Sequence, residues 1–374
     1  MDFSYSDEQQ AAIELARQIL GDRCTPQRLR ALELEGGPRF DRALWSSLAE
    51  AGLVAAGVPE AQGGAGLGFL VVAGIVEQVG RTAAPVPLLE TSVLGALPLA
   101  EFGSAELREA WLPRVARGEA ILTAALVEPE REPSQPGTRA VRDGAGYRLT
   151  GTKICVPAGP IADAILVPAA LERGGVGVFL VEARADGVSQ QSLITTSRQP
   201  ESVLELRDAR VGRDALLGTP ERGVEIVAWT ELRATAALCA LAVGVTAEAL
   251  RLTAEYTKTR KQFDQPIATF QAVGQRAADA FIDTEAIRLT ALQAAWRIDA
   301  GLPAEAAVAA AKYWASVGGS RVVRAAQHLH GGVGVDREYP LHRYYTFARQ
   351  LELTLGGGTQ QLRRLGRLIA RDVA

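Results

Sequence analysis

Apolar residues recur at every third or fourth position through the first third of the chain, which is the period of an amphipathic helix. The first such segment follows Ser6-Asp7-Glu8-Gln9, a helix N-cap pattern. Glycine and proline residues, as at Pro59–Gly68, separate the segments. Further helices are expected at Asp41–Ala51, Phe69–Thr82, Thr91–Glu101 and Ala105–Ala116. This pattern predicts a helical domain over residues 1–120.

The pattern changes after Ile121 to short runs rich in branched residues. Asp143-Gly144, between Arg139–Arg142 and Tyr147–Thr150, is a strong signal for a hairpin turn. The runs that fit strands are Leu122–Val127, Tyr147–Leu149, Lys153–Val156, Ala164–Val167, Val176–Val181 and Val203–Leu206. Short strands at regular spacing predict a small antiparallel barrel or sandwich, which we place at residues 121–215.

Helical periodicity returns after Gly218-Thr219-Pro220 and continues to an amphipathic last helix, Gln360–Ala370. Small residues dominate the apolar stripes, as in the stripe through Ala307, Ala311 and Val317. Because small residues let helices approach closely, we predict a four-helix bundle over residues 216–374. The fold class is therefore α+β, with strands between two helical parts.

Composition narrows the class of protein. The 374 residues carry a net charge of −3 with no block of like charge, so nucleic-acid binding is not indicated. The longest apolar run, Leu67–Val76, is too short to cross a bilayer. Cys24, Cys155 and Cys239 form no CxxC pair, which argues against disulfides and a zinc site. The acidic start, residues 1–8, does not resemble a signal peptide, so we expect a cytoplasmic protein.

The stretch Gln327–Gly334 reads Gln-His-Leu-His-Gly-Gly-Val-Gly and ends a long alanine-rich helical run. Glycines bring backbone close to a ligand and leave amide groups free to face a phosphate. A plain helix C-cap is the alternative interpretation. His328 and His330 stand two apart, which is not the i, i+4 spacing of a helical metal pair, so no metal site is predicted.

A second motif, Arg260-Lys261-Gln262-Phe263-Asp264-Gln265-Pro266-Ile267, is followed by Phe270-Gln271. Together with the glycine stretch and the order of domains, it resembles the acyl-CoA dehydrogenase family over essentially the whole chain. The resemblance implies FAD, whose adenosine diphosphate arm is gripped by a neighbouring subunit. It assigns this grip to Arg260, Phe263, Gln271, Gln327, Gly331, Gly332 and Gly334. Asp264 departs from the family, which usually has glycine there.

The family desaturates an acyl-CoA thioester: a glutamate removes the α-proton while a hydride leaves the β-carbon for the flavin. The resemblance places this base at Leu355 or Gly357, depending on the alignment, or at Ala234 in a minority of the family. None of these residues accepts a proton. Glu231, about one helical turn before Ala234, is the nearby candidate. An acidic residue favoured by the helix dipole is the alternative reading of Glu231.

The flavin-ring side of the resemblance is also degraded. Val127–Ser134 reads Val-Glu-Pro-Glu-Arg-Glu-Pro-Ser where the family has Thr-Glu-Pro-x-x-Gly-Ser, so three glutamates crowd the expected site. Lys153–Pro157 lacks the aromatic residue and the hydroxyl of the family's Lys-x-Trp-Ile-Thr/Ser. Within it, Cys155 is interpreted as a small buried strand residue, because no cationic neighbour activates it.

These losses suggest a hypothesis. Groups that hold a flavin ring within one subunit are lost, whereas groups that reach a neighbour's flavin are kept. The segment Leu351–Gly357 looks like the heteromeric α₂β₂ branch associated with bacterial steroid side-chain degradation. The expected partners are a homologous catalytic subunit, an acyl-CoA substrate and an electron-transfer flavoprotein. A self-sufficient dehydrogenase that uses Glu231 and a cofactor-free interaction protein on the same fold remain as alternatives.

Overall fold

The computed structural model describes residues 3–373, with side chains up to residue 371; Met1 and Asp2 of the acidic start lie outside the described residues. The chain forms two compact units that interleave along the sequence. The first unit comprises Met1–Leu34, Phe69–Ala84 and Thr235–Ala374, and the second comprises Glu35–Gly68 and Pro85–Ala234. The three-part division at residues 120 and 215 stays a prediction.

The first unit is helical, as the apolar periodicity predicts. Its helices are α1 (Asp7–Arg23), α2 (Pro26–Leu34), α4 (Phe69–Thr82), the larger part of α7 (Gly223–Thr259), α8 (Gln271–Asp299), α9 (Glu305–Tyr313), α10 (Gly319–His330), α11 (Leu341–Leu353) and α12 (Gly358–Val373). The predicted N-cap of α1 is confirmed: Ser6 Oγ accepts from the Gln9 amide at 3.2 Å, and Gln9 Oε1 accepts from the Ser6 amide at 3.0 Å.

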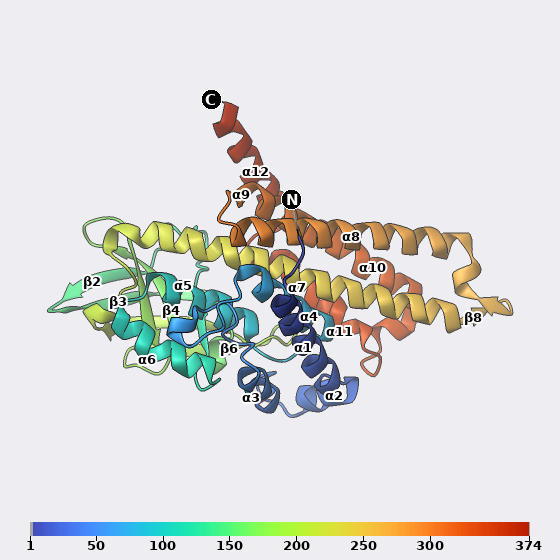
Figure 1. Cartoon of the computed structure of the whole chain (residues 1–374), viewed down its shortest axis with the longest axis horizontal. Coiled ribbons are helices and arrows are strands. Elements are labelled where there is room, and N and C mark those ends of the chain that lie inside the picture. The colour runs from blue at the N-terminus through green and yellow to red at the C-terminus, as the bar shows by residue number, and fades with distance from the viewer. Residues whose placement is uncertain (1–2, 374) are drawn as a thin grey trace. The chain divides into compact units, whose positions relative to one another are not determined.

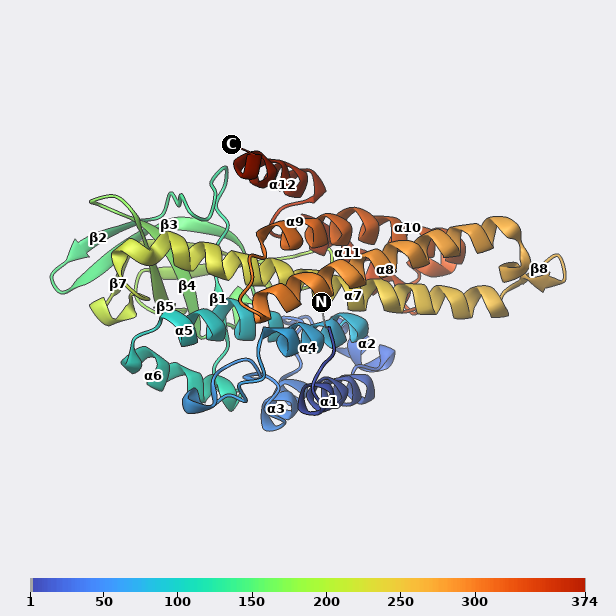
Figure 2. The same ribbon diagram turned by 45° about the horizontal axis from the view of Figure 1, so that its top comes forward.

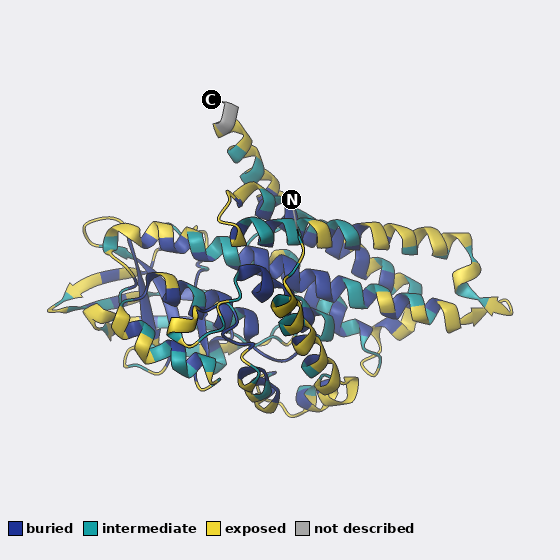
Figure 3. Cartoon of the chain, in the orientation of Figure 1, coloured by how far each residue is buried: buried dark blue, intermediate teal, exposed yellow. Residues whose placement is uncertain are grey.

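Two long helices, α7 and α8, run side by side in opposite directions, and a short hairpin joins their far ends (Figures 1 and 2). The hairpin consists of β8 (Lys261–Gln262) and β9 (Gln265–Pro266). Exposed residues gather at this end of the pair and along α12 (Figure 3). By length and composition the helix through Pro220–Thr259 could cross a membrane, but 72% of its most apolar window is buried within the protein, as in the core helix of a globular domain.

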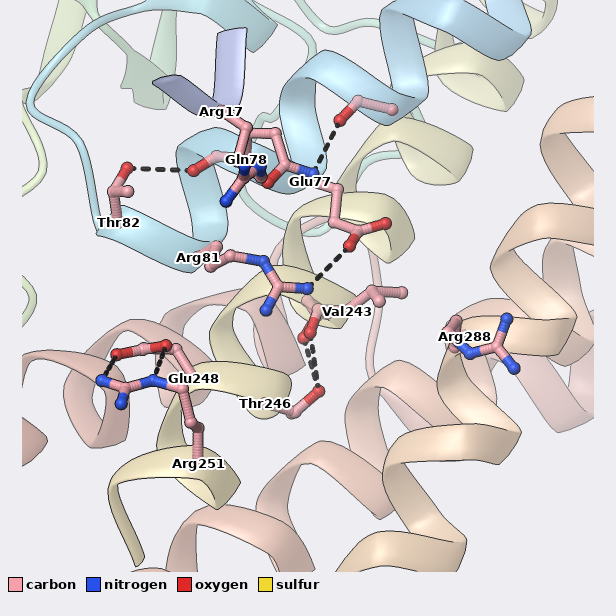
Figure 4. Close-up of polar contacts among 12 residues, drawn as sticks. Arg17, Glu77, Gln78, Arg81, Thr82, Val243, Thr246, Glu248, Arg251 and Arg288 are labelled. Atoms are coloured by element: carbon pink, nitrogen blue, oxygen red, sulfur yellow. Dashed lines mark hydrogen bonds and ion pairs between the residues drawn. The ribbon is translucent and has the colours of Figure 1, made fainter. Parts of the chain in front are cut away.

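Helices α4 and α7 cross at two glycines. A Cβ atom added at Gly244 would lie 2.0 Å from the Glu77 carbonyl oxygen, and one added at Gly80 would lie 2.1 Å from the Leu241 carbonyl oxygen. No larger residue fits without separating the helices. Polar groups on the same helices are satisfied locally near the crossing: Arg81 pairs with Glu77 on α4, and the Thr246 hydroxyl donates to the Ala242 carbonyl (Figure 4).

The second unit contains the sheet, the start of α7 and three whole α-helices: α3 (Arg42–Glu50), α5 (Leu97–Phe102) and α6 (Ala105–Ala116). The region predicted as one helix at Thr91–Glu101 is a π-helical stretch, Glu90–Ala96, that continues into α5. Gly95 is needed there, because a Cβ atom at this position would lie 2.3 Å from Cβ of Leu122 in the first strand.

The strands are β1 (Leu122–Ala124), β2 (Arg139–Asp143), β3 (Gly146–Pro157), β4 (Ala164–Leu171), β5 (Val176–Glu182), β6 (Val188–Leu193) and β7 (Glu201–Val211). They form one seven-stranded sheet in the order β1-β4-β2-β3-β7-β6, with β5 on β4. The β2–β3 hairpin turns at Asp143–Gly146, as predicted. The sheet is not wholly antiparallel, because β4 runs parallel to β1 and to β2.

Candidate cofactor-binding site

The hairpin between α7 and α8 presents an aromatic side chain to solvent. Gln262 pairs with Gln265, so Phe263 and Asp264 form a two-residue loop with φ of 54° and 62°. Such a loop needs positive φ at both central residues, and aspartate tolerates this better than most residues. Asp264, where the family usually has glycine, therefore fits this turn. Phe263 is 88% exposed and contacts Phe270 edge to face, which leaves one ring face open.

Arg260 and Gln271 flank this hairpin. Arg260 is exposed, and its guanidinium pairs with no carboxylate within residues 3–371. Its carbonyl accepts from the Ile267 amide at 2.8 Å, which fixes its backbone at the base of the hairpin. Gln271 is exposed at the first position of α8, whose N-cap residue Phe270 provides no side-chain cap. A free guanidinium, an open ring and an uncapped helix start suit an anionic, aromatic ligand.

The glycine turn follows α10 directly. Gly331 caps the helix with φ of 60°, and a 3₁₀ segment runs from Gly331 to Val335. No atom lies within 4 Å of a Cβ built at Gly331 or Gly332, so the turn is open above both residues. Gly334 leaves room for a side chain: a Cβ atom built there would lie 2.7 Å from Nε2 of Gln327, so a larger residue would displace the end of that side chain. The open backbone at Gly331 and Gly332 has the form expected of a phosphate-facing turn.

Gln327 has a role that the sequence did not indicate. Its Nε2 donates to the Gly331 carbonyl at 3.2 Å, so the side chain folds over the turn. His330 also holds the turn, since it is buried, stacks on Tyr256 at 4.4 Å and contacts the Tyr339 hydroxyl at 3.1 Å. Burial lowers the pKa of His330, and the hydrogen bond to the Ala326 carbonyl offsets only part of this shift. His330 is thus a structural residue.

The turn where the resemblance expects the base carries no acid. Leu355 and Gly356 have φ of 53° and 94° and form a tight left-handed turn between α11 and α12. Gln361 Nε2 donates to the Leu355 carbonyl at 3.1 Å, and the Gly357 amide donates to Oε1 of Gln360 at 3.0 Å. The nearest carboxylate in sequence, Glu352, is paired with Arg349. Neither Leu355 nor Gly357 can therefore act as a base.

A buried lysine holds the helix that leads into this turn. Lys312 Nζ donates to the Leu351 carbonyl at 2.8 Å and to Ser316 Oγ at 3.0 Å. Burial lowers the pKa of Lys312 to about 8, and the neighbouring Cys239 and Glu352 oppose this shift. The sequence analysis missed this residue. The available signal was a lysine at helical spacing from Val308 and Ala315, which are both buried.

The second expected base position is Ala234, which is fully buried in α7. Glu231 lies one turn earlier on the same helix, is half-buried and makes contacts of its own. Arg233, between them, stacks on Trp229 with 3.5 Å from its guanidinium carbon to the ring centroid. The role of Glu231 as a displaced base therefore stays a prediction.

The sequence suggested that Glu128 crowds the flavin-ring side, but its carboxylate is bound within the protein. Its carboxylate is buried and accepts bonds from Lys153 Nζ at 2.5 Å, Thr138 Oγ1 at 2.7 Å and the Gly137 amide at 2.6 Å. Lys153 also donates to the Pro168 carbonyl at 2.7 Å. The pair clamps the segment before β2 onto the sheet, which explains why the motif keeps its first glutamate.

Cys155 is exposed, so the prediction that it is buried is wrong. Its φ of 49° marks an irregularity in β3, between Lys153 and Val156, that turns the side chain out of the strand pattern. No group of three histidine, cysteine or acidic residues within the described part of the chain could hold a metal ion. The absence of a metal cofactor stays a prediction.

Comparisons with known proteins agree with the family resemblance found in the sequence. A family model described as acyl-CoA dehydrogenase, C-terminal domain, matches residues 221–373, and one described as acyl-CoA dehydrogenase, N-terminal domain, matches residues 6–119. Acyl-CoA dehydrogenase FadE27 of Mycobacterium tuberculosis (strain ATCC 25618 / H37Rv) is 43% identical over 383 residues, which is 100% of both chains.

Solved structures match as closely. A chain of the ChsE4-ChsE5 complex from Mycobacterium tuberculosis has a TM-score of 0.93 and 44% identity, with 99% of each chain covered. A variant of the Tcur3481-Tcur3483 steroid ACAD has a TM-score of 0.90 and 44% identity, covering 98% of this chain and 99% of that one. The FAD complex of PigA matches with a TM-score of 0.90 and 27% identity over 99% of each chain. The chain belongs to the acyl-CoA dehydrogenase family, whose members bind FAD.

Proposed function

We propose that this chain is the base-free subunit of a heteromeric acyl-CoA dehydrogenase and completes the FAD site of a homologous catalytic partner in an α₂β₂ assembly. One observation carries the proposal. The expected base positions hold Leu355, Gly357 and Ala234, whereas Arg260 and Phe263 remain exposed for a ligand. The similarity to chains of two-component complexes supports the same reading.

The residues present fit the diphosphate end of FAD. Among the described residues, Arg260 offers a guanidinium without a carboxylate partner, Phe263 an exposed ring, and Gly331 and Gly332 open space where a Cβ atom would stand. These groups would hold and orient the cofactor, with Gln271 toward a ribose or the adenine. When bound, FAD supplies the hydride acceptor for α,β-desaturation of the acyl-CoA, and the electrons pass to an electron-transfer flavoprotein. The proton goes to the partner's base.

The similarity to a steroid ACAD supports a bulky polycyclic acyl group. We also propose that the reaction takes place in the cytoplasm. The self-sufficient alternative would need Glu231, which is half-buried in α7, to act as the base. A cofactor-free interaction protein would have no need for a free Arg260 beside an exposed Phe263. The heteromeric hypothesis accounts both for the missing base and flavin-ring residues and for the retained residues that would hold the diphosphate.

Flavin stoichiometry tests the proposal. Visible absorbance is measured on the purified chain alone and on the chain co-expressed with the acyl-CoA dehydrogenase paralogue encoded beside it. We expect a colourless lone chain and about one FAD per pair of chains in the complex. If the chain purified alone is yellow and carries one FAD per chain, it contains a complete FAD site and the proposal is contradicted. A complex without flavin would favour the interaction protein.

A further inference from the structure

Three aromatic rings meet where the glycine turn begins. His330 is buried at the end of α10 and stacks on Tyr256 of α7, with 4.4 Å between the ring centroids. Tyr339, which follows the turn, lies 5.1 Å from the His330 ring and 6.3 Å from the Tyr256 ring. These three residues, the aromatic cluster, therefore join α7, α10 and the segment before α11.

The aromatic cluster is connected to both parts of the proposed cofactor grip. Tyr256 lies one helical turn before Arg260, whose amide donates to the Tyr256 carbonyl at 2.8 Å. His330 directly precedes Gly331, where the open turn begins. A shift of the His330 ring relative to Tyr256 would therefore change the distance between the Arg260 hairpin and the turn. Packed side chains that fix such a spacing preorganise a binding site.

The hydrogen bonds of His330 require its neutral form. Nδ1 lies 2.8 Å from the Ala326 carbonyl oxygen, which can only accept, so Nδ1 carries the proton. Nε2 then has a free lone pair and accepts from the Tyr339 hydroxyl at 3.1 Å. A second proton on Nε2 would remove this acceptor and place a charge in a buried position.

The surroundings of His330 offer that charge no free counter-ion. Burial lowers the pKa of His330, and among the described residues no charged group of α7, α8 or α11 acts directly on it. Glu248 and Glu255 of α7 act on Tyr339, but both pair with Arg251, at 2.5 Å and 2.6 Å. The cluster is therefore complete at neutral pH, and it weakens as the pH falls below the ordinary pKa of histidine toward the lower pKa of the folded state.

We propose that the aromatic cluster positions the two parts of the cofactor grip for one FAD diphosphate, and that protonation of His330 loosens this grip and speeds release of the cofactor. The inference rests on the function proposed above. His330 is a positioning residue in this scheme, because it acts through Gly331 and Arg260 and touches no reacting atom. A cluster that only stabilised the fold would give no link between this proton and the flavin.

The test uses the flavin-loaded complex of the two chains. FAD release after dilution is followed by its fluorescence at several pH values from about 8 to about 5. We expect wild type to release FAD at least about tenfold faster at the acid end. His330→Phe keeps a ring in the stack but cannot be protonated, so it should lose this acceleration. His328→Phe, the same change at an exposed position of α10, is the matched control and should follow wild type.

Tyr339→Phe is a milder second variant. It removes the hydroxyl that favours the neutral ring of His330, so the acceleration should begin at a higher pH than in wild type. Its release at about pH 8 should also rise, by about threefold to tenfold, because one hydrogen bond is lost. If His330→Phe does not fold, as judged by circular dichroism, the shift in Tyr339→Phe decides the proposal.

Two results overturn the inference and leave the proposed function standing, because the complex still carries flavin. One is a wild-type release rate that does not change with pH. The other is a pH profile with the same shape in wild type, His330→Phe and Tyr339→Phe, even if both variants release FAD faster throughout. A wild-type complex that carries no flavin refutes the proposed function, and this inference with it.

Discussion

The buried ion pair between Glu128 and Lys153 joins the two motifs Val127–Ser134 and Lys153–Pro157. Both side chains are nearly inaccessible, and the Nζ to Oε1 distance is 2.5 Å. Burial alone would raise the pKa of Glu128, but bonds from Lys153 and Thr138 outweigh it and hold that pKa below its usual value. Burial lowers the pKa of Lys153, opposed by Glu128. The stability of this region therefore depends on a charged pair in a dry environment.

We predict that Lys153→Met destabilises the chain by about 3–5 kcal/mol, because it leaves the Glu128 carboxylate buried without a cation. The folded pKa of Glu128 is depressed, so its contribution is complete above the unfolded pKa and is lost as pH falls through the folded pKa. Urea unfolding at pH 7 and at pH 4 measures both effects. Lys258→Met, at an exposed lysine of α7, is the control and should change little.

An alternative outcome would show that the clamp is not electrostatic. If Lys153→Met lowers the free energy of unfolding by less than about 1 kcal/mol, the methionine packs well enough to replace the ion pair, as hydrophobic substitutes sometimes do when both partners are replaced. Glu128→Gln with Lys153→Met then separates the loss of the cation from the cost of the remaining acid.

At the level of elements, the crossing of α4 and α7 depends on backbone contact. Gly244→Ala would place a methyl group 2.0 Å from the Glu77 carbonyl oxygen, which cannot move without shifting α4. We expect a loss of at least about 3 kcal/mol, the upper end of ordinary overpacking. Gly274→Ala, in the exposed start of α8 where nothing lies within 4 Å, should instead stabilise by roughly 1 kcal/mol.

Chemical unfolding of the purified chain compares the two variants directly. Equal effects at Gly244 and Gly274 would mean that the α4–α7 distance adjusts freely, and that helix propensity alone sets the change. A large loss at Gly244 with a gain at Gly274 would show that the crossing distance is fixed by the glycine pair.

Elements with a strong apolar period were predictable from the sequence, and weak ones were not. The capping box at Ser6 and the hairpin turn at Asp143 are local, so their residues alone determine them. Strand β6 was missed because Val188–Leu193 has no buried residue and hence no apolar alternation. The π-helical stretch Glu90–Ala96 has helical periodicity and differs from an α-helix only in its hydrogen bonding.

The candidate site divides in the same way. The turn at Phe263-Asp264 and the cap at Gly331 follow from short motifs. The buried position of the Glu128 carboxylate depends on Lys153, which is 25 residues away in the sequence. Lys312 likewise donates to a carbonyl 39 residues away. Pairings over such separations leave no periodic signal in one sequence. Sequence reasoning therefore proposed the candidate site residues and missed Lys312 and the buried position of Glu128.

For the whole molecule, the decisive question is which chain removes the α-proton. In the proposed assembly the partner provides the base, so Glu231→Gln in this chain should leave both the flavin content and kcat of the complex within about twofold of wild type. Arg260→Gln serves as a positive control: it removes a charge from the diphosphate grip, and we expect it to lower flavin content. Turnover with an acyl-CoA substrate and absorbance of the same samples provide both measurements.

The two alternatives make opposite forecasts for this pair of variants. In a self-sufficient enzyme Glu231→Gln abolishes turnover while flavin is retained, because the loss of a general base removes a proton acceptor and leaves the cofactor site intact. In a shared site only Arg260→Gln has an effect, and it acts through cofactor binding. Loss of turnover with full flavin in Glu231→Gln would therefore refute the shared site, even if the two chains copurify.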